Sequence, residues 1–305
     1  MTGDSKYQLA QKQSLPLEQK IILSHQRIIE WYDHWDGQVY ISTSGGLDST
    51  VLTHLVRTVR PDVPAVFCNT GVEFPENIKH VKKTTNLEII RPKLMFHEVI
   101  EKWGYPVVSK EQSQYIYEYR NTNSEKLRHL RWHGNDKRGG AIFKKWRFLI
   151  DAPFKISDKC CDELKKKPFK KYERRTGRKG ILGIRAIEGH KRVQDYGKYG
   201  CNAYETKRPL SRPMSFWLDD DVWEYLKTYN LEYSDLYNKG YTRSGCFGCL
   251  FGIHNDDNQN RMLTLKETHP KLHDYCIYKL KINEVLDYLG VEYEPKEGDY
   301  VGEDE

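Results

Sequence analysis

The chain has 305 residues, of which 38% are hydrophobic and 30% charged, and its formal net charge is +6. No apolar run is long enough to span a membrane, and the first residues, MTGDSKYQLAQKQ, lack the apolar core of a signal peptide. These features exclude a membrane-spanning protein and favour a globular, cytoplasmic one whose chain can bury a full core.

The N-terminal part of the chain alternates between predicted helices and strands. A helix is expected over residues 15–34, where Ile21, Ile28 and Trp31 recur at helical intervals, and the β-branched run at 39–41 indicates a strand. The same pattern continues with a helix from residue 47, a strand at 65–68, a helix from Pro75 and a short strand at 87–90. This alternation predicts an α/β fold with a Rossmann-like parallel sheet and helices on both faces.

The turn after the first strand has an unusual composition, reading Ser44-Gly45-Gly46-Leu47-Asp48-Ser49. Gly45 and Gly46 allow backbone angles closed to other residues, and Ser44 or Asp48 can cap the next helix. Free N–H groups at a helix start attract phosphate. An ordinary glycine-containing turn is the alternative, but the flanking hydroxyls and carboxylate favour a phosphate site. Neither a Walker loop nor a dinucleotide-binding glycine pattern occurs in the chain.

A second polar turn, Asn69-Thr70-Gly71, follows the strand at 65–68. Ligands of parallel sheets bind beyond the carboxyl ends of the strands, so we expect this turn on the same edge as the phosphate loop.

The rest of the chain shows less regular patterns. Residues 101–150 are interpreted as a helical insertion with a mobile loop, and KGILGIRAIEG as a strand that runs into a turn. Asp219 to Asp221 are well placed to begin a helix, and a last amphipathic helix is expected over 272–288. The expected organisation is an N-terminal helical segment (1–37), a nucleotide-binding α/β domain (38–230) and a C-terminal cysteine-containing segment (231–305).

Four of the seven cysteines form two close pairs, Cys160-Cys161 and Cys246-x-x-Cys249. A C-x-x-C pair serves in redox, zinc and iron–sulfur sites. Because adjacent thiolates rarely reach one small zinc ion, the four together favour a [4Fe–4S] cluster over zinc. The isolated cysteines at 68, 201 and 276 are interpreted as ordinary buried residues.

Nine Lys and Arg crowd residues 165–179. Such a run is a solvated face or an anion-binding surface for nucleotide phosphates or a nucleic-acid backbone. Further along, Gly183 marks a close turn, and Arg185, Lys191 and Arg192 could reach an anion from the same edge.

Together these motifs resemble the phosphoadenosine phosphosulfate reductase family of the adenine nucleotide alpha hydrolase superfamily. The phosphate loop is similar to the family's pyrophosphatase (PP) loop, and Asn69-Thr70-Gly71 with its Phe-Pro-Glu to the second nucleotide loop. Gly183-Ile184-Arg185 with Glu188 and Arg192 resembles the Gly-Ile-Arg-x-x-Glu-Ser motif, although Gly189 replaces the serine. The four paired cysteines look like the cluster ligands of adenylylsulfate reductases.

Two departures change what the resemblance implies. The reductases carry a nucleophilic Glu-Cys-Gly in a C-terminal tail, whereas no cysteine follows Cys276 here. The insertion that ends in DAPFKISDKCC looks more like the iron–sulfur ATP pyrophosphatases of DNA phosphorothioation systems.

The resemblance therefore predicts an enzyme that binds ATP with Mg²⁺, cleaves it to AMP and pyrophosphate, and adenylates an acceptor during sulfur transfer. Residues 44–49 would hold the pyrophosphate, Asp48 would orient the loop or bind Mg²⁺, and Asn69 to Gly71 would hold the adenosine. Arg185 and Arg192 would hold the phosphates. The catalytic candidates are Ser44, Asp48, Ser49 and Arg185.

Two other hypotheses stay open. One is a sulfonucleotide reductase, and the other is a non-catalytic nucleotide- or nucleic-acid-binding module with a structural cluster. Expected partners are an adenine nucleotide, a nucleic acid at residues 165–179, and a cysteine desulfurase or thioredoxin-like protein, with no membrane and a homo-oligomeric assembly.

Overall fold

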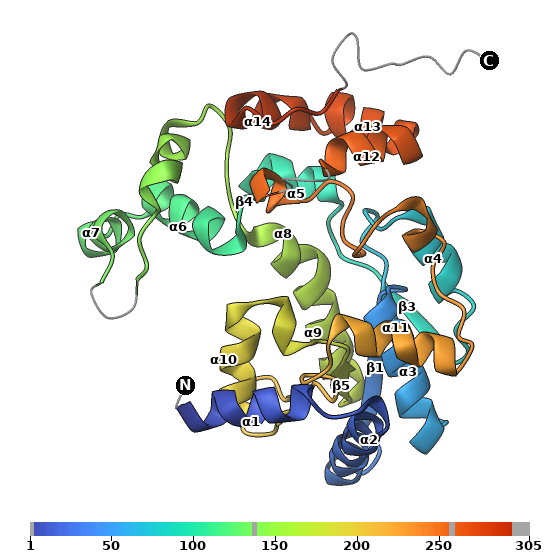
Figure 1. Cartoon of the computed structure of the whole chain (residues 1–305). Coiled ribbons are helices and arrows are strands. Elements are labelled where there is room, and N and C mark those ends of the chain that lie inside the picture. The colour runs from blue at the N-terminus through green and yellow to red at the C-terminus, as the bar shows by residue number, and fades with distance from the viewer. Residues whose placement is uncertain (1–2, 136–138, 256–259, 295–305) are drawn as a thin grey trace, which may run out of the picture. The chain divides into compact units, whose positions relative to one another are not determined.

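The computed structural model describes residues 3–135, 139–255 and 260–294 (Figure 1). The chain forms two compact units. The first contains Met1–Asn69, Glu73–Arg91 and Pro168–Ser244, and the second contains Thr70–Val72, Pro92–Lys167 and Gly245–Glu305. This division groups the expected insertion with the C-terminal cysteine segment. The boundaries expected at residues 37 and 230 stay predictions.

The first unit is built on a six-stranded sheet with the order β3-β2-β1-β5-β7-β6. Its strands are β1 (Val39–Thr43), β2 (Ala65–Cys68), β3 (Leu87–Ile90), β5 (Lys179–Leu182), β6 (Asn202–Ala203) and β7 (Leu210–Ser211). All neighbouring strands are parallel except β6 and β7, which are antiparallel. The predicted parallel sheet is confirmed, and β6 and β7 were not predicted.

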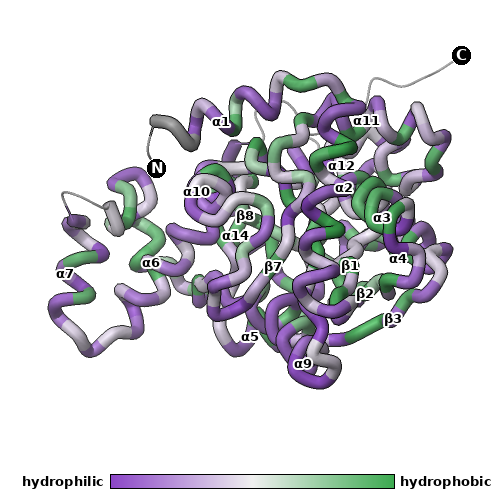
Figure 2. The backbone as a smooth tube through the Cα atoms, turned by 90° about the horizontal axis from the view of Figure 1, so that it is seen from below, coloured by the Kyte–Doolittle hydropathy of each residue, from purple (hydrophilic) through white to green (hydrophobic). Residues whose placement is uncertain are grey.

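Alternating residues of β1 bury both faces of this sheet, as the two-residue period of a strand requires. Val39 and Ile41 belong to the large core that includes residues of α2 (Leu17–His34), α3 (Leu47–Val59) and α11 (Asp219–Thr228). Tyr40 points to the opposite face, where it packs on Tyr172 of α9 (Lys167–Thr176). The apolar α3 and the hydrophilic α9 are plain in Figure 2. Helices cover both faces of the sheet, as predicted. Because β1 and β5 are neighbouring parallel strands, their carboxyl ends lie at the same edge of the sheet.

The remaining helices of this unit are α1 (Gly3–Gln13), α4 (Pro75–Val81) and α10 (His190–Tyr199). Helix α4 begins at the predicted proline, and the carboxylate of Asp221 in the first turn of α11 accepts the Leu218 N–H at 2.6 Å. Helices α1 and α10 were not predicted.

The second unit is mainly helical. It contains α5 (Phe96–Trp103), α6 (Lys110–Asn121), α7 (Glu125–His133), α8 (Lys159–Cys161), α12 (Arg261–Thr268), α13 (Pro270–Asp274) and α14 (Ile282–Leu289). One short parallel pair joins β4 (Val107–Val108) to β8 (Leu250–Phe251). The helical insertion is thus confirmed, and part of its expected mobile loop, residues 136–138, lies outside the described residues.

The prediction of one helix over 272–288 is wrong. The segment consists of α13, a π-helical turn (Tyr275–Lys279) and α14, with a break before α14. Lys281 adopts a left-handed conformation with φ 52°, which a continuing α-helix cannot accommodate. Within the described ranges, no helix is long and apolar enough to cross a membrane.

A buried ion pair ties α2 to α11. The Lys20 ammonium contacts the two carboxylate oxygens of Asp221 at 2.8 and 2.6 Å, and the residues are only 2% and 7% exposed. Removing one partner leaves an uncompensated buried charge, so Lys20→Met should lower the free energy of unfolding by about 3–5 kcal/mol. Chemical denaturation followed by circular dichroism measures the change.

The control is Lys83→Met, because Lys83 pairs with Glu232 at the surface, where the two side chains are 59% and 73% exposed. This substitution should leave the free energy of unfolding nearly unchanged, because solvent screens an exposed ion pair. Equal losses for both variants would contradict the assigned role of the buried pair.

Candidate functional site

The predicted phosphate loop lies between β1 and α3 in a conformation that only glycine fits. Gly45 has φ 78°, and a Cβ atom there would lie 2.4 Å from the Asn77 carbonyl oxygen. Gly46 is equally crowded, because its Cβ would meet the Ser244 hydroxyl at 2.3 Å. At Gly45 the crowding atom is backbone and φ is left-handed, so only glycine fits there, whereas at Gly46 the crowding atoms are side-chain hydroxyls and φ is −83°.

The hydroxyl of Ser49 holds the loop closed. It accepts the Ser44 N–H at 3.1 Å and donates to the Gly46 carbonyl oxygen at 2.9 Å, while the two serine hydroxyls lie 3.2 Å apart. The prediction that Ser44 or Asp48 caps the helix is wrong, because Gly46 is the N-cap and has no side-chain cap. Ser49 is buried and Ser44 exposed, so of the two hydroxyls that of Ser44 is the one open to a ligand.

Tyr237 contributes to the loop from a distant part of the sequence. Its hydroxyl accepts the Leu47 N–H at 3.1 Å, one of the helix-start donors that would otherwise face a phosphate. Burial raises the pKa of Tyr237, so this hydroxyl stays protonated. Sequence reasoning missed it, and the only available signal was its position shortly before the Cys246 pair.

Arg185 links the phosphate loop to the loop after β5. Its Nε lies 2.7 Å from Asp48 Oδ1, and its Nη2 donates to Asp219 Oδ1 at 2.8 Å. Gly183 permits this approach, because a Cβ there would lie 2.8 Å from the Asp48 carbonyl oxygen. The structure therefore brings together Asp48 and Arg185, two residues predicted for the site.

Burial and charge act in opposite directions on this pair. Burial raises the pKa of Asp48, and the Arg185 guanidinium partly offsets the rise. Burial alone would lower the pKa of Arg185, but the carboxylates of Asp48 and Asp219 raise it above its ordinary value. Arg185 Nη1 is buried without a hydrogen-bond partner in the described structure, so one strong donor remains for an anionic ligand.

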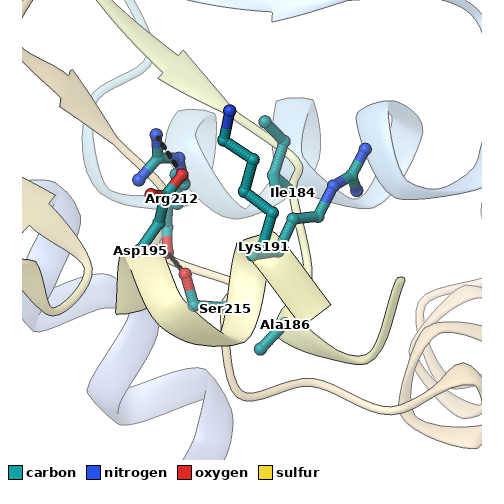
Figure 3. Close-up of a pocket in the computed structure, with 7 residues that line it drawn as sticks. Ile184, Ala186, Lys191, Asp195, Arg212 and Ser215 are labelled. Atoms are coloured by element: carbon teal, nitrogen blue, oxygen red, sulfur yellow. Dashed lines mark hydrogen bonds and ion pairs between the residues drawn. The ribbon is translucent and has the colours of Figure 1, made fainter. Parts of the chain in front are cut away.

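Glu188 connects Arg185 to Arg192. One of its carboxylate oxygens accepts the Arg185 N–H at 2.7 Å, and the other pairs with the Arg192 guanidinium. Arg192 also lines a pocket of about 230 Å³ (Figure 3). The other residues of this pocket are Ile184, Ala186, Lys191, Asp195, Arg212 and Ser215. Arg212, which lies 3.8 Å from Asp195, is a cation that sequence reasoning missed.

A second cavity, of about 310 Å³, adjoins the phosphate loop at Thr43 and Gly45. His80 lines it and contacts the Thr50 hydroxyl through Nε2 at 3.0 Å. Burial lowers the pKa of both His80 and His54 in this wall, so both imidazoles are neutral near pH 7.

The second nucleotide turn is divided between the units. Asn69 directly follows β2 in the first unit, and its N–H donates to the Ile90 carbonyl oxygen at 2.9 Å. Thr70 and Gly71 belong to the second unit, where Gly71 has φ 82°. Their predicted contact with adenosine stays a prediction.

All four paired cysteines belong to the second unit. Cys160 and Cys161 are hydrogen-bonded to each other, and Cys246 and Cys249 act electrostatically on Cys160. The hydrogen bond from Cys160 and the charges of Lys110, Lys165 and Lys166 lower the pKa of Cys161 to about 6, although burial opposes the shift. Cys68, Cys201 and Cys276 lie buried elsewhere, as expected.

The donor set of these thiols fits an iron–sulfur cluster. Thiolates are the usual ligands of a [4Fe–4S] cubane, and nearby lysines favour the ionised form that ligation requires. In the part of the chain that the structure describes, no three His, Cys, Asp or Glu side chains converge on a single metal ion. A cubane takes one protein ligand at each of its four iron atoms, so such convergence is not required for it. The cluster stays a prediction for these residues.

The basic stretch at 165–179 is largely engaged within the protein. Lys166 and Lys167 pair with Asp162 and Glu163, each at 2.6 Å, and Arg175 pairs with Glu88. Two more cations make contacts inside the first unit, since Arg178 donates to the Val39 carbonyl oxygen and Lys179 lies over the Trp35 ring. The nucleic-acid contact predicted here stays a prediction.

Most of the chain matches a known protein family. Residues 38–131 and 107–250 match the phosphoadenosine phosphosulfate reductase domain. The chain belongs to this family. The matched ranges include the phosphate loop, Arg185 and all four paired cysteines, so the family predicted from the motifs is confirmed.

Relatives within and around the family differ in length and name. An uncharacterised protein of Methanocaldococcus jannaschii is 25% identical over 276 residues, which are 87% of this chain and 53% of that protein. The chain thus spans about half of this relative and 37% of a second uncharacterised protein of the same organism. An adenosine 5'-phosphosulfate reductase of Anoxybacillus flavithermus is 22% identical, with 81% of this chain and 88% of the reductase covered.

Among solved structures, phosphoadenylyl-sulfate (PAPS) reductase from Candida auris is 17% identical, with a TM-score of 0.43. The match covers 76% of this chain and 96% of that one.

The crowding at Gly45 predicts a loss of phosphate binding on substitution. Gly45→Ala would force a Cβ against the Asn77 backbone and displace the loop, so binding of inorganic pyrophosphate should fall by at least about tenfold, equivalent to about 1.4 kcal/mol. Isothermal titration calorimetry measures the binding constant.

Gly177→Ala is the matched control. Gly177 has φ 75° and no atom within 4 Å of a Cβ placed there, so it pays the same backbone strain without the clash. If both variants bound pyrophosphate equally, the loop would not be the phosphate site.

Proposed function

We propose that this member of the phosphoadenosine phosphosulfate reductase family is an ATP pyrophosphatase that adenylates an acceptor for sulfur transfer. ATP would place its β and γ phosphates on the loop at residues 44–49, with Mg²⁺ neutralising their charge. Cleavage between the α and β phosphates would release pyrophosphate and transfer AMP to an acceptor oxygen. A sulfur nucleophile would later displace the AMP.

The burial and raised pKa of Cys276 are our main reason for proposing ATP, rather than a sulfonucleotide, as the substrate. A reductase of this family needs a cysteine that attacks the substrate sulfur, and Cys276 is the one cysteine that follows the Cys246 pair in the sequence. It is fully buried in the π-helical turn, and burial raises its pKa to about 12. A buried, protonated thiol is a poor nucleophile. This state of Cys276 favours transfer of the adenylyl group over attack of Cys276 on a sulfonucleotide.

The residues of the first unit have defined tasks in this reaction. The N–H groups of the loop and the Ser44 hydroxyl would bind the leaving pyrophosphate, and the free Nη1 of Arg185 would meet the charge that develops on the α-phosphate. Asp48 fits an orienting role, because its carboxylate is paired with Arg185. With ATP bound, Mg²⁺ would take its ligands mainly from the phosphates and water, as this ion commonly does.

Cys160, Cys161, Cys246 and Cys249 would hold a [4Fe–4S] cluster. When bound, such a cluster would supply electrons, carry sulfur or brace the surrounding unit.

A second candidate is a sulfonucleotide reductase, favoured by the relatives that are named adenosine 5'-phosphosulfate reductases. In that case a partner protein would supply the missing nucleophile, and sulfite would be released from adenylylsulfate.

The two candidates are separated by supplying anaerobically purified protein with ATP or with adenylylsulfate and thioredoxin. The proposal expects AMP and pyrophosphate from ATP. Arg185→Gln should lower the rate of AMP formation by about 10²–10³-fold, the typical loss for one donor to a developing charge. Chromatographic quantification of AMP measures this rate.

Arg27→Gln is the control, because Arg27 pairs with Glu30 on the exposed face of α2 and should leave the rate unchanged. Sulfite release from adenylylsulfate, without AMP formation from ATP in the presence of nucleic-acid and small-molecule acceptors, would establish the reductase instead.

The cluster assignment makes a separate prediction. Cys160→Ser and Cys249→Ser should each lose most of the bound iron and sulfide, because each removes one of four thiolate ligands. Cys201→Ser and Cys276→Ser should keep the full content, since both residues lie outside the ligand set. Colorimetric iron and sulfide assays and visible absorbance measure the result. Iron retained in both ligand variants would contradict the assignment.

A further inference from the structure

Residues 110–148 carry a charge equal to that of the entire chain. They contain ten Lys and Arg against four Asp and Glu, an excess of +6, so the remaining 266 residues are balanced. The same segment contains seven aromatic residues. Basic residues interleaved with aromatics are the composition of a nucleic-acid-binding surface. Residues 165–179, by contrast, contain only Phe169 and Tyr172.

Part of this segment exposes side chains to solvent rather than packing them into the core. Helices α6 and α7 pack on each other at the end of the second unit opposite α12 and α13 (Figures 1 and 2). None of the nine residues of α7 is buried, although its first turn is capped by the Ser124 hydroxyl. A capped helix with no buried residue presents all of its faces at least partly to solvent. The exposed basic side chains of this helix, Lys126 and Arg128, are therefore accessible to a ligand.

An aromatic pocket of about 270 Å³ lies on this surface, lined by Tyr119, Glu125, Arg128, His129, Trp132 and His133. The Trp132 ring is held by the Arg147 guanidinium, 4.1 Å from its centroid, and by Tyr119 at 5.8 Å. The His129 and His133 rings lie 4.3 Å apart on adjacent turns of α7. The walls are flat π surfaces already fixed in position, which suits the stacking of a base.

The cations of the segment fall into two groups. Arg120 and Arg131 are engaged in the fold, because Arg120 donates to the Phe154 carbonyl oxygen and Arg131 pairs with Glu118 at 2.6 Å. A second group is exposed and surrounds the pocket or follows it in sequence, and it consists of Lys126, Arg128, Lys144 and Lys145. Within it, Arg128 also donates to the Thr122 carbonyl oxygen at 2.8 Å, and Lys145 lies over the Trp146 ring. Phe143, next to this group, is 56% exposed. Exposed cations beside an exposed ring match the alternation of phosphate and base along a single strand.

We propose that the described parts of this segment, residues 110–135 and 139–148, bind single-stranded nucleic acid. Its phosphates contact Lys126, Arg128, Lys144 and Lys145, and its bases stack on Phe143 and in the Trp132 pocket. Glu125 in the pocket wall can accept a hydrogen bond from an exocyclic amino group. That the nucleic acid is the acceptor in sulfur transfer rests on the proposed function. The binding itself needs neither ATP nor a cluster.

The test measures fluorescence anisotropy of labelled 20-nucleotide single-stranded DNA, single-stranded RNA and duplex DNA with the full chain and no ATP. Lys126→Glu/Lys144→Glu should weaken single-strand binding by at least about tenfold and reduce the slope of log K against log salt by about two. The strand type that binds more tightly, DNA or RNA, identifies the acceptor class. Binding confined to duplex DNA would overturn the proposal.

The matched control is Lys170→Glu/Lys171→Glu, which makes the same change in net charge on exposed residues of the 165–179 stretch. It should change the affinity less than twofold. If this control weakened binding as much as the double variant of the insertion did, the affinity would depend on net charge or on residues 165–179. The proposal would then be wrong.

Aromatic variants test the stacking independently of charge. Phe143→Ala should weaken binding by about tenfold while leaving the salt slope unchanged, because one stacked base is lost and no phosphate contact. Trp132→Ala should do the same, and the exposed position of Phe143 keeps the test valid if the Trp132 variant does not fold. Displacement of the strand by equimolar poly-glutamate would contradict base stacking and reduce the site to a general polyanion surface.

The outcome is separable from that of the ATP assay. AMP formation from ATP with no binding of any oligonucleotide at low salt would retain the proposed function and reject this inference. Oligonucleotide binding that depends on Lys126, Lys144 and Phe143, without any ATP cleavage, would retain the inference as a binding site and reject the proposed reaction.

Discussion

The ion pair between Arg185 and Asp48 fixes the geometry of the candidate phosphate site. These residues come from the loops that follow β5 and β1, two neighbouring parallel strands whose carboxyl ends meet at one edge. A charge placed in such a position is costly unless it is paired. Each residue compensates the other, and Gly183 provides the space that their approach requires. The phosphate loop and the Gly-Ile-Arg turn thus act as one structure rather than two motifs.

This arrangement leaves donors directed outward at the place where an anion would bind. Ser49 and Tyr237 satisfy part of the loop's own hydrogen-bonding requirement, while Ser44 and Arg185 Nη1 retain capacity for a ligand. A site whose internal bonds are already made needs little reorganisation when the charge on a phosphate changes during reaction. The site is therefore suited to stabilise a developing charge, whichever nucleotide it takes.

The four paired cysteines and the insertion belong to the second unit. Cysteines that are 85 or more residues apart in sequence act on one another electrostatically only because the chain returns to this unit after Ser244. The same unit holds the basic and aromatic surface of α6 and α7. The proposed cluster and nucleic-acid contacts thus fall in the second unit, and the proposed phosphate contacts fall in the first.

Much of the first unit could be predicted from local sequence. The strands at 39–43 and 65–68 have apolar runs that are largely buried, and such runs carry a strong signal, whereas those at 87–90 and 179–182 are only partly buried. The phosphate loop was equally readable because its glycines serve a local backbone requirement. The two-residue strands β6 and β7 lack any comparable run, and their pairing depends on contact with β5.

The sequence by itself determined the alternation of strand and helix, the glycine loop and the family, because each depends on residues that are neighbours in the chain. Only the tertiary structure decided that Tyr237 reaches the Leu47 N–H, that Arg212 joins Arg192 at one pocket, and that Cys276 is buried. It also divided the cations, since Lys166, Lys167 and Arg175 of the run at 165–179 form ion pairs while Lys126 of α7 faces solvent. A sequence gives the number of charged side chains. Whether each can contact a ligand depends on the partners that folding brings within a few ångströms of it.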